Sequence, residues 1–259
     1  MRELTNLQWP DTPYGADKRP FGRRVHLLTG MAMQCADTGR TVEPVAAAAV
    51  FVPIHRTRQA TVTPGTLHVG YRVAVAETGD DTAALLRFVD GILVQGRRHA
   101  AALAWHSYRD DLHVMQGLAA GRLPGVTGIG DAWADRTRRE RGICPLIDTA
   151  NDLAGAGGLV AHAAEKHGIE LGGVLRTLQR PDSTQGLHNA LTDGVEAPGT
   201  LVSKLAAGAI TQALTVALLG GKALERLAWK EPFDLEEAVR LSAWDMLGPI
   251  LNARPDASR

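Results

Sequence analysis

Two polar segments carry residue types that could do metal or acid–base chemistry. In the first, W-H-S-Y-R-D-D-L, His106 precedes the acidic pair Asp110 and Asp111; in the second, H-N-A-L-T-D, Asp193 lies five positions after His188. A histidine that moves a proton, beside a carboxylate that holds a divalent cation, would activate water. Each segment also has a plain explanation, since an aspartate at a helix start caps unpaired N–H groups and polar pairs are common in loops.

Both segments must be positioned by the surrounding strands and helices. Three apolar segments, rich in β-forming residues or bounded by turn residues, predict three strands in a meander: 25–33, 42–52 and 67–76. Thr78 and the following G-D-D cap a helix whose apolar residues recur over 85–93. Residues 99–105 then predict a short buried strand that opens into a helix over 110–118. The first polar segment lies at this strand-to-helix change, where function tends to reside in α/β proteins.

The second half of the chain is predicted to be mostly helical. Residues 121–142 are rich in glycine and arginine without an apolar period and predict a functional or mobile loop. A brief strand or helix start follows at 146–149, then a helix over 159–167. Residues 200–219 are apolar almost all round and are stopped by two glycines, which predicts a buried helix. A capping box at 234–237 opens a last helix to residue 247. This order predicts a mixed α/β sheet with helices on both faces.

The predicted loop carries four guanidinium groups within six residues: Arg136, Arg138, Arg139 and Arg141. Such a cluster suits a phosphate backbone, although a solvated loop is the plain alternative. Tyr108 and Trp133 lie near the same presumed cleft and could stack on an unpaired base.

Composition excludes several classes of protein. Lys plus Arg and Asp plus Glu both number 28, so the formal net charge is zero and the chain is neither a basic nucleic-acid coat nor an acidic disordered tail. The two cysteines, Cys35 and Cys144, are far apart without a C-x-x-C partner, which indicates neither a disulfide framework nor a zinc site. The first residues hold no apolar signal core and polar residues interrupt the 200–219 stretch, so a cytoplasmic protein without membrane contact is expected.

The order of motifs, H-S-x-x-D-D, L-I-D-T, K-H-G-I and then H-N-A-L-T-D before a long apolar helix, resembles the DEDD superfamily of 3′–5′ exonucleases. The resemblance is to the His-containing branch that includes polymerase proofreading subunits, and it spans residues 23–219. It implies a ribonuclease H-like fold, two Mg²⁺ or Mn²⁺ ions, and the 3′ end of single-stranded DNA or RNA as substrate. Matched residue by residue, Asp111 and Asp193 would hold metal and His188 would be the base, with His106 at the head of the second motif.

The first motif departs from this pattern. The family has Asp-x-Glu on its first strand, where this sequence has Thr29 and Met31. Because loss of outer-shell partners alone costs roughly 10–100-fold in metal affinity or activity, loss of two direct ligands should cost at least as much. Four other acids could substitute: Asp37, Glu43, Glu77, and Asp110 in place of Asp111.

Three functional hypotheses follow: an exonuclease with impaired activity, the same fold kept as an inactive module that binds nucleic acid or a protein, or an unrelated α/β enzyme. Convergence of the matched residues would exclude the last. The expected organisation is an extended arm over 1–22, an exonuclease-like domain over 23–219, and a helical extension over 220–259. Its last helix would cover the core or dock a protein partner.

Overall fold

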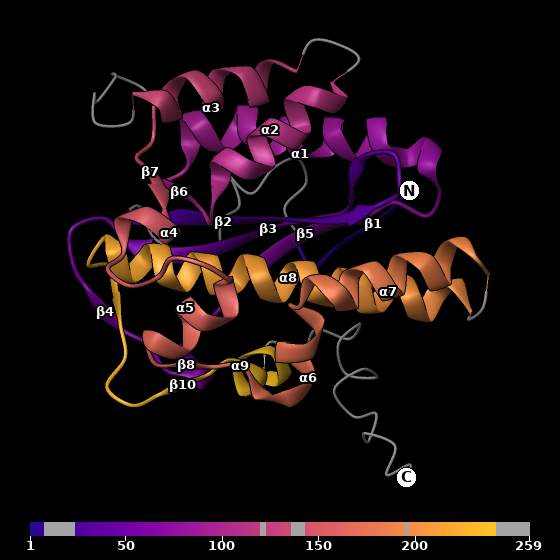
Figure 1. Ribbon diagram of the computed structural model, residues 1–259. Helices are drawn as coiled ribbons and strands as arrows, with labels where there is room; N and C mark the ends of the chain where they lie inside the picture. The colour runs from indigo at the N-terminus through magenta and orange to yellow at the C-terminus, as the bar shows by residue number, and fades with distance from the viewer. Residues whose placement is uncertain (8–23, 120–122, 136–142, 195–196, 242–259) are drawn as a thin grey trace, which may run out of the picture.

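The computed structural model describes residues 1–7, 24–119, 123–135, 143–194 and 197–241. A six-stranded sheet lies between two layers of helices, so the predicted mixed α/β class with helices on both faces is confirmed (Figure 1).

The strand order in the sheet is β1-β5-β3-β2-β6-β7. Their bounds are β1 Arg2–Thr5, β2 Val25–Asp37, β3 Val42–His55, β5 Gly70–Val75, β6 Ala102–Trp105 and β7 Leu146–Asp148. β2, β3 and β5 form the predicted antiparallel meander, whereas β6 pairs in parallel with β2, and β7 with β6. The chain therefore builds the sheet outward from β2 in both directions.

The central strands are longer than predicted because their apolar residues face helices on both sides. In β3, residues 45–52 (V-A-A-A-A-V-F-V) are all buried, the pattern of a strand covered on both faces. A register shift between Gln34 and Cys35 introduces a bulge near the end of β2.

The start of the predicted extended arm over residues 1–22 joins the sheet. Arg2–Thr5 forms β1, which pairs antiparallel with β5 at one edge of the sheet. No apolar alternation marks these four residues; hydrogen bonds to a neighbouring strand fix them. Residues 8–22 lie outside the described residues.

One face of the sheet is covered by α1 Thr82–His99, α2 Tyr108–Leu118 and α3 Pro124–Ala134. The third helix corrects the prediction of a loop over 121–142, at least for its central part. Proline stands at the start of α3, and Val126 and Ile129 are buried against α1. A β-carbon at Gly125 would collide with the Asp90 carbonyl oxygen of α1, so glycine here allows the two helices to pack closely.

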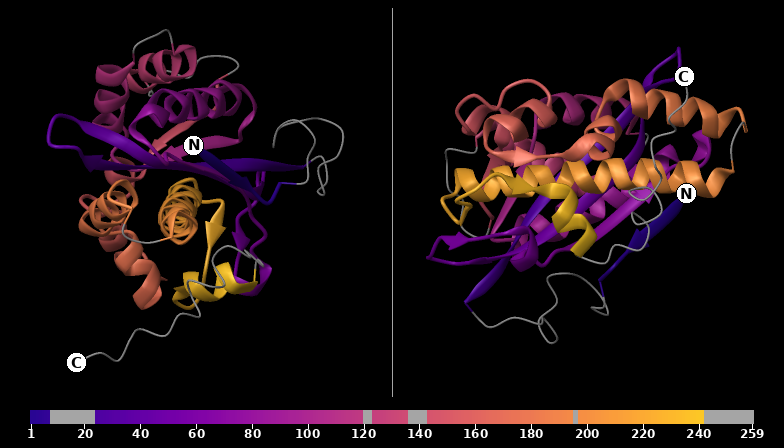
Figure 2. Two further views of the ribbon diagram at one scale, coloured as in Figure 1. Left: turned by 90° about the vertical axis from the view of Figure 1, so that its right-hand side faces the viewer. Right: turned by 90° about the horizontal axis from the view of Figure 1, so that it is seen from below.

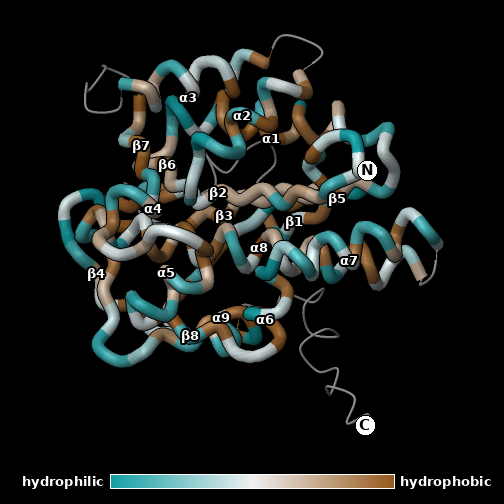
Figure 3. Tube along the Cα trace, in the orientation of Figure 1, coloured by the Kyte–Doolittle hydropathy of each residue, from teal (hydrophilic) through white to brown (hydrophobic). Residues whose placement is uncertain are grey.

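The other face is covered by α8 Pro198–Ala223, which contacts β2 and β3 and is flanked by shorter helices (Figure 2). These are α4 Thr149–Asp152, α5 Val160–Lys166, α6 Gly172–Leu178, α7 Pro181–Thr192 and α9 Leu235–Leu241. By length and apolar composition α8 could cross a membrane, but 83% of its most apolar window is buried inside the fold. The predicted buried helix is thus confirmed, and Figure 3 shows its apolar residues between the sheet and the outer helices.

The described part of the predicted C-terminal extension packs onto the rest of the protein. α8 continues past the expected boundary at residue 220. Beyond it β9 Leu227–Ala228 pairs with β4 Ala60–Thr61, and β10 Phe233–Asp234 pairs with β8 Ile169–Glu170. In α9, Leu235 and Val239 belong to the same core cluster as α8, as expected for a helix that covers the core. The predicted remainder of this helix lies outside the described residues.

Candidate functional site

The carboxyl ends of β2 and β6 form the candidate site. After β2 the chain first adds β3 and β5 on one side of it and then adds β6 and β7 on its other side. The direction in which strands are added therefore reverses between β2 and β6. In open α/β sheets, ligands bind outside the carboxyl ends of the strands at such a switch point. Gly30 pairs with Ala104, which places the next residues, Met31 and Trp105, side by side just before α2.

Asp111 is a partly buried carboxylate on α2 at this point. Trp105 Nε1 donates a hydrogen bond of 2.6 Å to Asp111 Oδ2. Burial raises the pKa of Asp111 to about 7; the Trp105 hydrogen bond opposes this rise and the neighbouring Asp110 charge adds to it. Burial, and secondly the charge of Asp111, also raise the pKa of Cys35 at the end of β2. The sequence-predicted Asp111 therefore lies at the switch point and exchanges its proton near neutral pH.

Thr29 and Met31, which stand where the resemblance expects two acids, are both fully buried in β2. Met31 belongs to the core cluster under α1, α2 and α3, together with Trp105 and Tyr108. The first-motif positions are thus part of the hydrophobic core and offer no carboxylate to a ligand.

Tyr108 requires a correction. Its side chain is completely buried, stacked on Trp133 with ring centroids 4.1 Å apart and edge-on to Trp105 at 5.2 Å. Because the ring is completely buried and already stacked on Trp133, Tyr108 does not present a surface on which a base could stack. Burial raises the pKa of its hydroxyl, which has no hydrogen-bond partner in the part of the chain that the structure describes.

His106 anchors a loop to the end of β6. Its Nε2 lies 2.6 Å from the Gly158 carbonyl oxygen and its Nδ1 lies 2.9 Å from Thr149 Oγ1. A carbonyl can only accept, so Nε2 carries a hydrogen. Burial lowers the pKa of His106, against the opposing effects of the Gly158 contact and of Asp148. The residue at the head of the second motif is therefore a positioning group.

Asp148, which the sequence reasoning did not single out, ties the ends of β6 and β7 together. Its Oδ1 accepts hydrogen bonds from the backbone N–H groups of Ser107 (3.0 Å) and Ala150 (3.2 Å), and its Oδ2 accepts one from Asn151 Nδ2 (2.7 Å). Ser107 has a positive φ of 56°, a left-handed conformation that this hydrogen bond helps to hold. The available signal was L-I-D-T, an apolar strand followed directly by a helix-capping aspartate.

We expect Asp148→Ala to lower the free energy of unfolding by about 2 to 4 kcal/mol, because it removes a buried acceptor and leaves part-buried N–H groups at the β6 and α4 ends without a partner. Urea unfolding followed by tryptophan fluorescence measures this. Asp148→Asn, which keeps one acceptor oxygen, is the matched control and should lose less. Equal stability of the alanine variant and the parent protein would contradict the structural role.

His188 and Asp193 lie on the opposite face of the sheet from α2 (Figure 1). His188 is inside α7 and the exposed Asp193 caps the carboxyl end of that helix. Burial lowers the pKa of His188, opposed by Glu43, and its Nδ1 is buried without a hydrogen-bond partner among the described residues. The structure does not place these two residues on the same face as Asp111.

The acids considered as substitutes have local partners. Asp37 Oδ1 accepts from the Gly39 N–H (2.7 Å), and Glu77 Oε1 accepts from Arg2 Nη2 (2.8 Å). Glu43 accepts hydrogen bonds from two threonine hydroxyls, whereas Asp110 is exposed on the first turn of α2. The arginine cluster over 136–142 lies outside the described residues.

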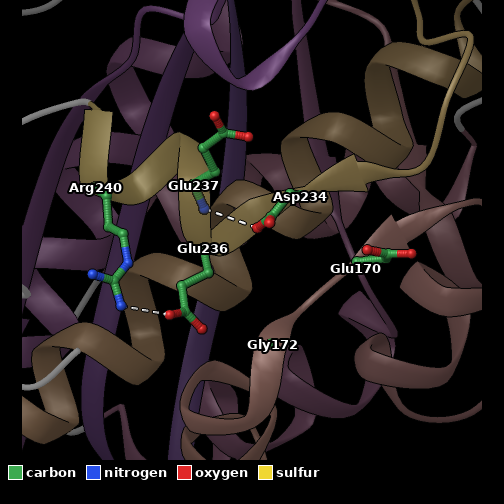
Figure 4. Close-up of a pocket in the computed structure, with 6 residues that line it drawn as sticks. All are labelled: Glu170, Gly172, Asp234, Glu236, Glu237 and Arg240. Carbon is green, nitrogen blue, oxygen red and sulfur yellow. Dashed lines mark hydrogen bonds and ion pairs between the residues drawn. The ribbon is translucent and has the colours of Figure 1, made fainter. Parts of the chain in front are cut away.

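A second polar feature is a shallow pocket at the junction of β8, β10 and α9 (Figure 4). Two of its carboxylates already have partners. Glu236 forms an ion pair with Arg240 at 2.8 Å, and Asp234 accepts a hydrogen bond from the Glu237 N–H at 2.8 Å. The pocket is lined by Glu170, Gly172, Asp234, Glu236, Glu237 and Arg240.

The described residues do not fit the two-metal centre that the resemblance implies. No group of three or more His, Cys, Asp or Glu side chains within the described ranges could hold a metal ion. One oxygen of Asp111 accepts a hydrogen bond from Trp105, and Asp193 lies at the end of α7 on the other face of the sheet. Fold and site together define an α/β protein with a mixed sheet and a buried carboxylate at its switch point. No family model matches the chain, and neither does any curated protein or solved structure.

Proposed function

We propose that this chain is a ribonuclease H-like module of the exonuclease type that binds nucleic acid without two-metal hydrolysis. Two features support the fold assignment: the early three-strand meander continued by parallel strands, with helices on both faces, and the order of motifs along the chain. The first is what the resemblance to DEDD exonucleases implies, and the second is the basis of that resemblance.

The observation that carries the proposal is the burial of Thr29 and Met31. Two-metal catalysis needs carboxylates that bridge or flank ions about 3.5–4 Å apart. A threonine and a methionine packed under α1–α3 cannot supply them, and Asp111 alone is a poor ligand while its pKa is near neutrality.

The test is incubation with a 3′-overhang oligonucleotide labelled at its 5′ end, in Mn²⁺ buffer at pH 8. We expect a retarded but intact oligonucleotide. An Asp111→Ala, Asp193→Ala double variant controls for contaminating nuclease and should behave like the parent protein. A ladder of shortened products from the parent protein alone would contradict the proposal.

A second candidate is a 3′–5′ exonuclease of impaired activity, with Asp111 and Asp193 as ligands of Mg²⁺ or Mn²⁺ and His188 as the base. The specific observations in its favour are the raised pKa of Asp111 and the unpartnered, buried Nδ1 of His188, because perturbed titratable groups concentrate at functional sites. This candidate requires a change of structure that brings α7 and α2 together, and His188→Asn would then abolish the product ladder.

A further inference from the structure

A group of exposed arginines lies at the end of the sheet where β2 and β6 begin, opposite the switch point. They come from the start of β2, the turn after β3 and the last turn of α1: Arg24, Arg56, Arg58 and Arg98. This end of the molecule also holds β4 and the chain after α8, on the left in Figure 1. We refer to these four residues as the arginine end.

Backbone hydrogen bonds bring the segments of the arginine end together. The Arg56 N–H donates to the Arg24 carbonyl oxygen at 3.1 Å, next to the pair formed by Val25 and His55. The Ala101 N–H donates to the Leu27 carbonyl oxygen at 2.7 Å, which places the end of α1 beside the start of β2. Arginines far apart in sequence therefore lie at the same end of the sheet.

The turn that presents two of these arginines is held in place by a side chain. His55 Nδ1 accepts hydrogen bonds from the backbone N–H groups of Thr57 and Arg58, both at 3.2 Å. This arrangement fixes the conformation of the 56–58 turn, so less backbone entropy is lost when its guanidinium groups bind a ligand.

The charge of the arginine end is not neutralised by described side chains. Arg2, Arg72, Arg176 and Arg240 each form an ion pair with a glutamate. None of the four arginine-end residues forms one with a described carboxylate. The chain after α8, which pairs with β4 just beyond the 56–58 turn, offers exposed Glu225 and Glu231. Because the whole chain has zero formal net charge, this excess is a local feature.

A phosphate backbone fits this surface better than a membrane does. The planar guanidinium group binds phosphate oxygens through paired N–H groups, and several such groups along one edge suit a repeating polyanion. The exposed large apolar side chains among the described residues, Met1, Val42, Leu159 and Leu241, all lie outside the segments that carry these arginines. Arg98 could simply complement the dipole of α1, but the other three are not on a helix.

We propose that the arginine end is the surface that binds the nucleic-acid phosphate backbone, an inference that rests on the proposed nucleic-acid-binding function. The contact lies at the amino ends of β2 and β6, away from Asp111. A nucleic-acid strand bound there is held without its 3′ end being directed to the switch point.

The test compares Arg24→Gln, Arg56→Gln, Arg58→Gln with a matched control, Arg40→Gln, Arg109→Gln. The control arginines are also exposed but lie near the carboxyl ends of β2 and β6. Fluorescence anisotropy with a labelled single-stranded oligonucleotide is measured from 50 to 200 mM salt. The triple variant should bind at least about tenfold more weakly, with a salt dependence shallower by about two in log–log slope. The control should stay within about twofold of the parent protein.

Other results overturn the proposal in distinguishable ways. Unchanged affinity of the triple variant, or an equal loss in the control, would reject the arginine end and leave the proposed function standing. Failure of the parent protein to bind at 50 mM salt would reject both. Binding to phosphatidylserine vesicles that depends on these arginines, with unchanged oligonucleotide binding, would assign the surface to a membrane instead. If the triple variant unfolds early, Arg58→Gln alone should still weaken binding about two- to threefold.

Discussion

Replacement of Gly30 by valine is expected to lower the free energy of unfolding by at least about 3 kcal/mol. A β-carbon at this position of β2 would collide with the Ala213 carbonyl oxygen and lie 2.7 Å from Ala217 Cβ. These contacts belong to α8, the central helix, so neither element can move without disrupting the core. Overpacking of this kind costs about 1–3 kcal/mol or more, and backbone contacts place it at the upper end, against a total stability of about 5–15 kcal/mol. Urea unfolding followed by tryptophan fluorescence is the measurement.

Gly91→Ala is the matched control. Gly91 is exposed on α1, and a β-carbon there would meet no atom within 4 Å. Alanine should raise stability by about 0.5–1 kcal/mol through its better helix propensity. If the valine variant at position 30 kept the parent stability, the close packing of α8 on β2 would be refuted.

The elements that sequence reasoning located are those whose apolar pattern is continuous. The meander, the buried strand before α2 and the central helix α8 are each predominantly apolar over their length. α3 was missed because Gly125, Gly128 and Gly130 lower its helix propensity. The benefit of these glycines is a tertiary contact, since Gly125 and Gly128 lie close to α1 and Gly130 lies close to α2. β1 was missed for the same kind of reason, since pairing with β5 fixes it.

At the site, local sequence located Asp111 but not the packing around it. The burial of Tyr108 depends on Trp133, which reaches it from α3, and no spacing rule relates these two residues. The face occupied by His188 depends on the path of the chain between β7 and α8. The motif H-N-A-L-T-D indicates that both residues lie on or next to one helix, but not which side of the sheet that helix covers.

The Asp111 carboxyl group should make the protein less stable as pH rises. Its pKa is raised from 3.8 to about 7 in the folded protein, chiefly by burial. Below about pH 4 both the folded and the unfolded forms hold the proton, so the carboxyl group does not lower the free energy of unfolding. Between about pH 4 and 7 the unfolded chain releases the proton while the folded protein keeps it, and stability falls. Above about pH 7 both forms are ionised, so the loss of stability no longer changes with pH.

Asp111→Asn is therefore expected to stabilise the protein at pH 8 by about 2 to 4 kcal/mol and to change little at pH 4. The amide keeps an oxygen that can accept the Trp105 hydrogen bond without the cost of a buried charge. Urea unfolding at both pH values, compared with the parent protein, measures the difference. Equal stability of variant and parent at pH 8 would show that Asp111 is solvated as a carboxylate. The expected gain would identify a charge that the fold retains at a cost, as proteins do where a residue serves binding or chemistry.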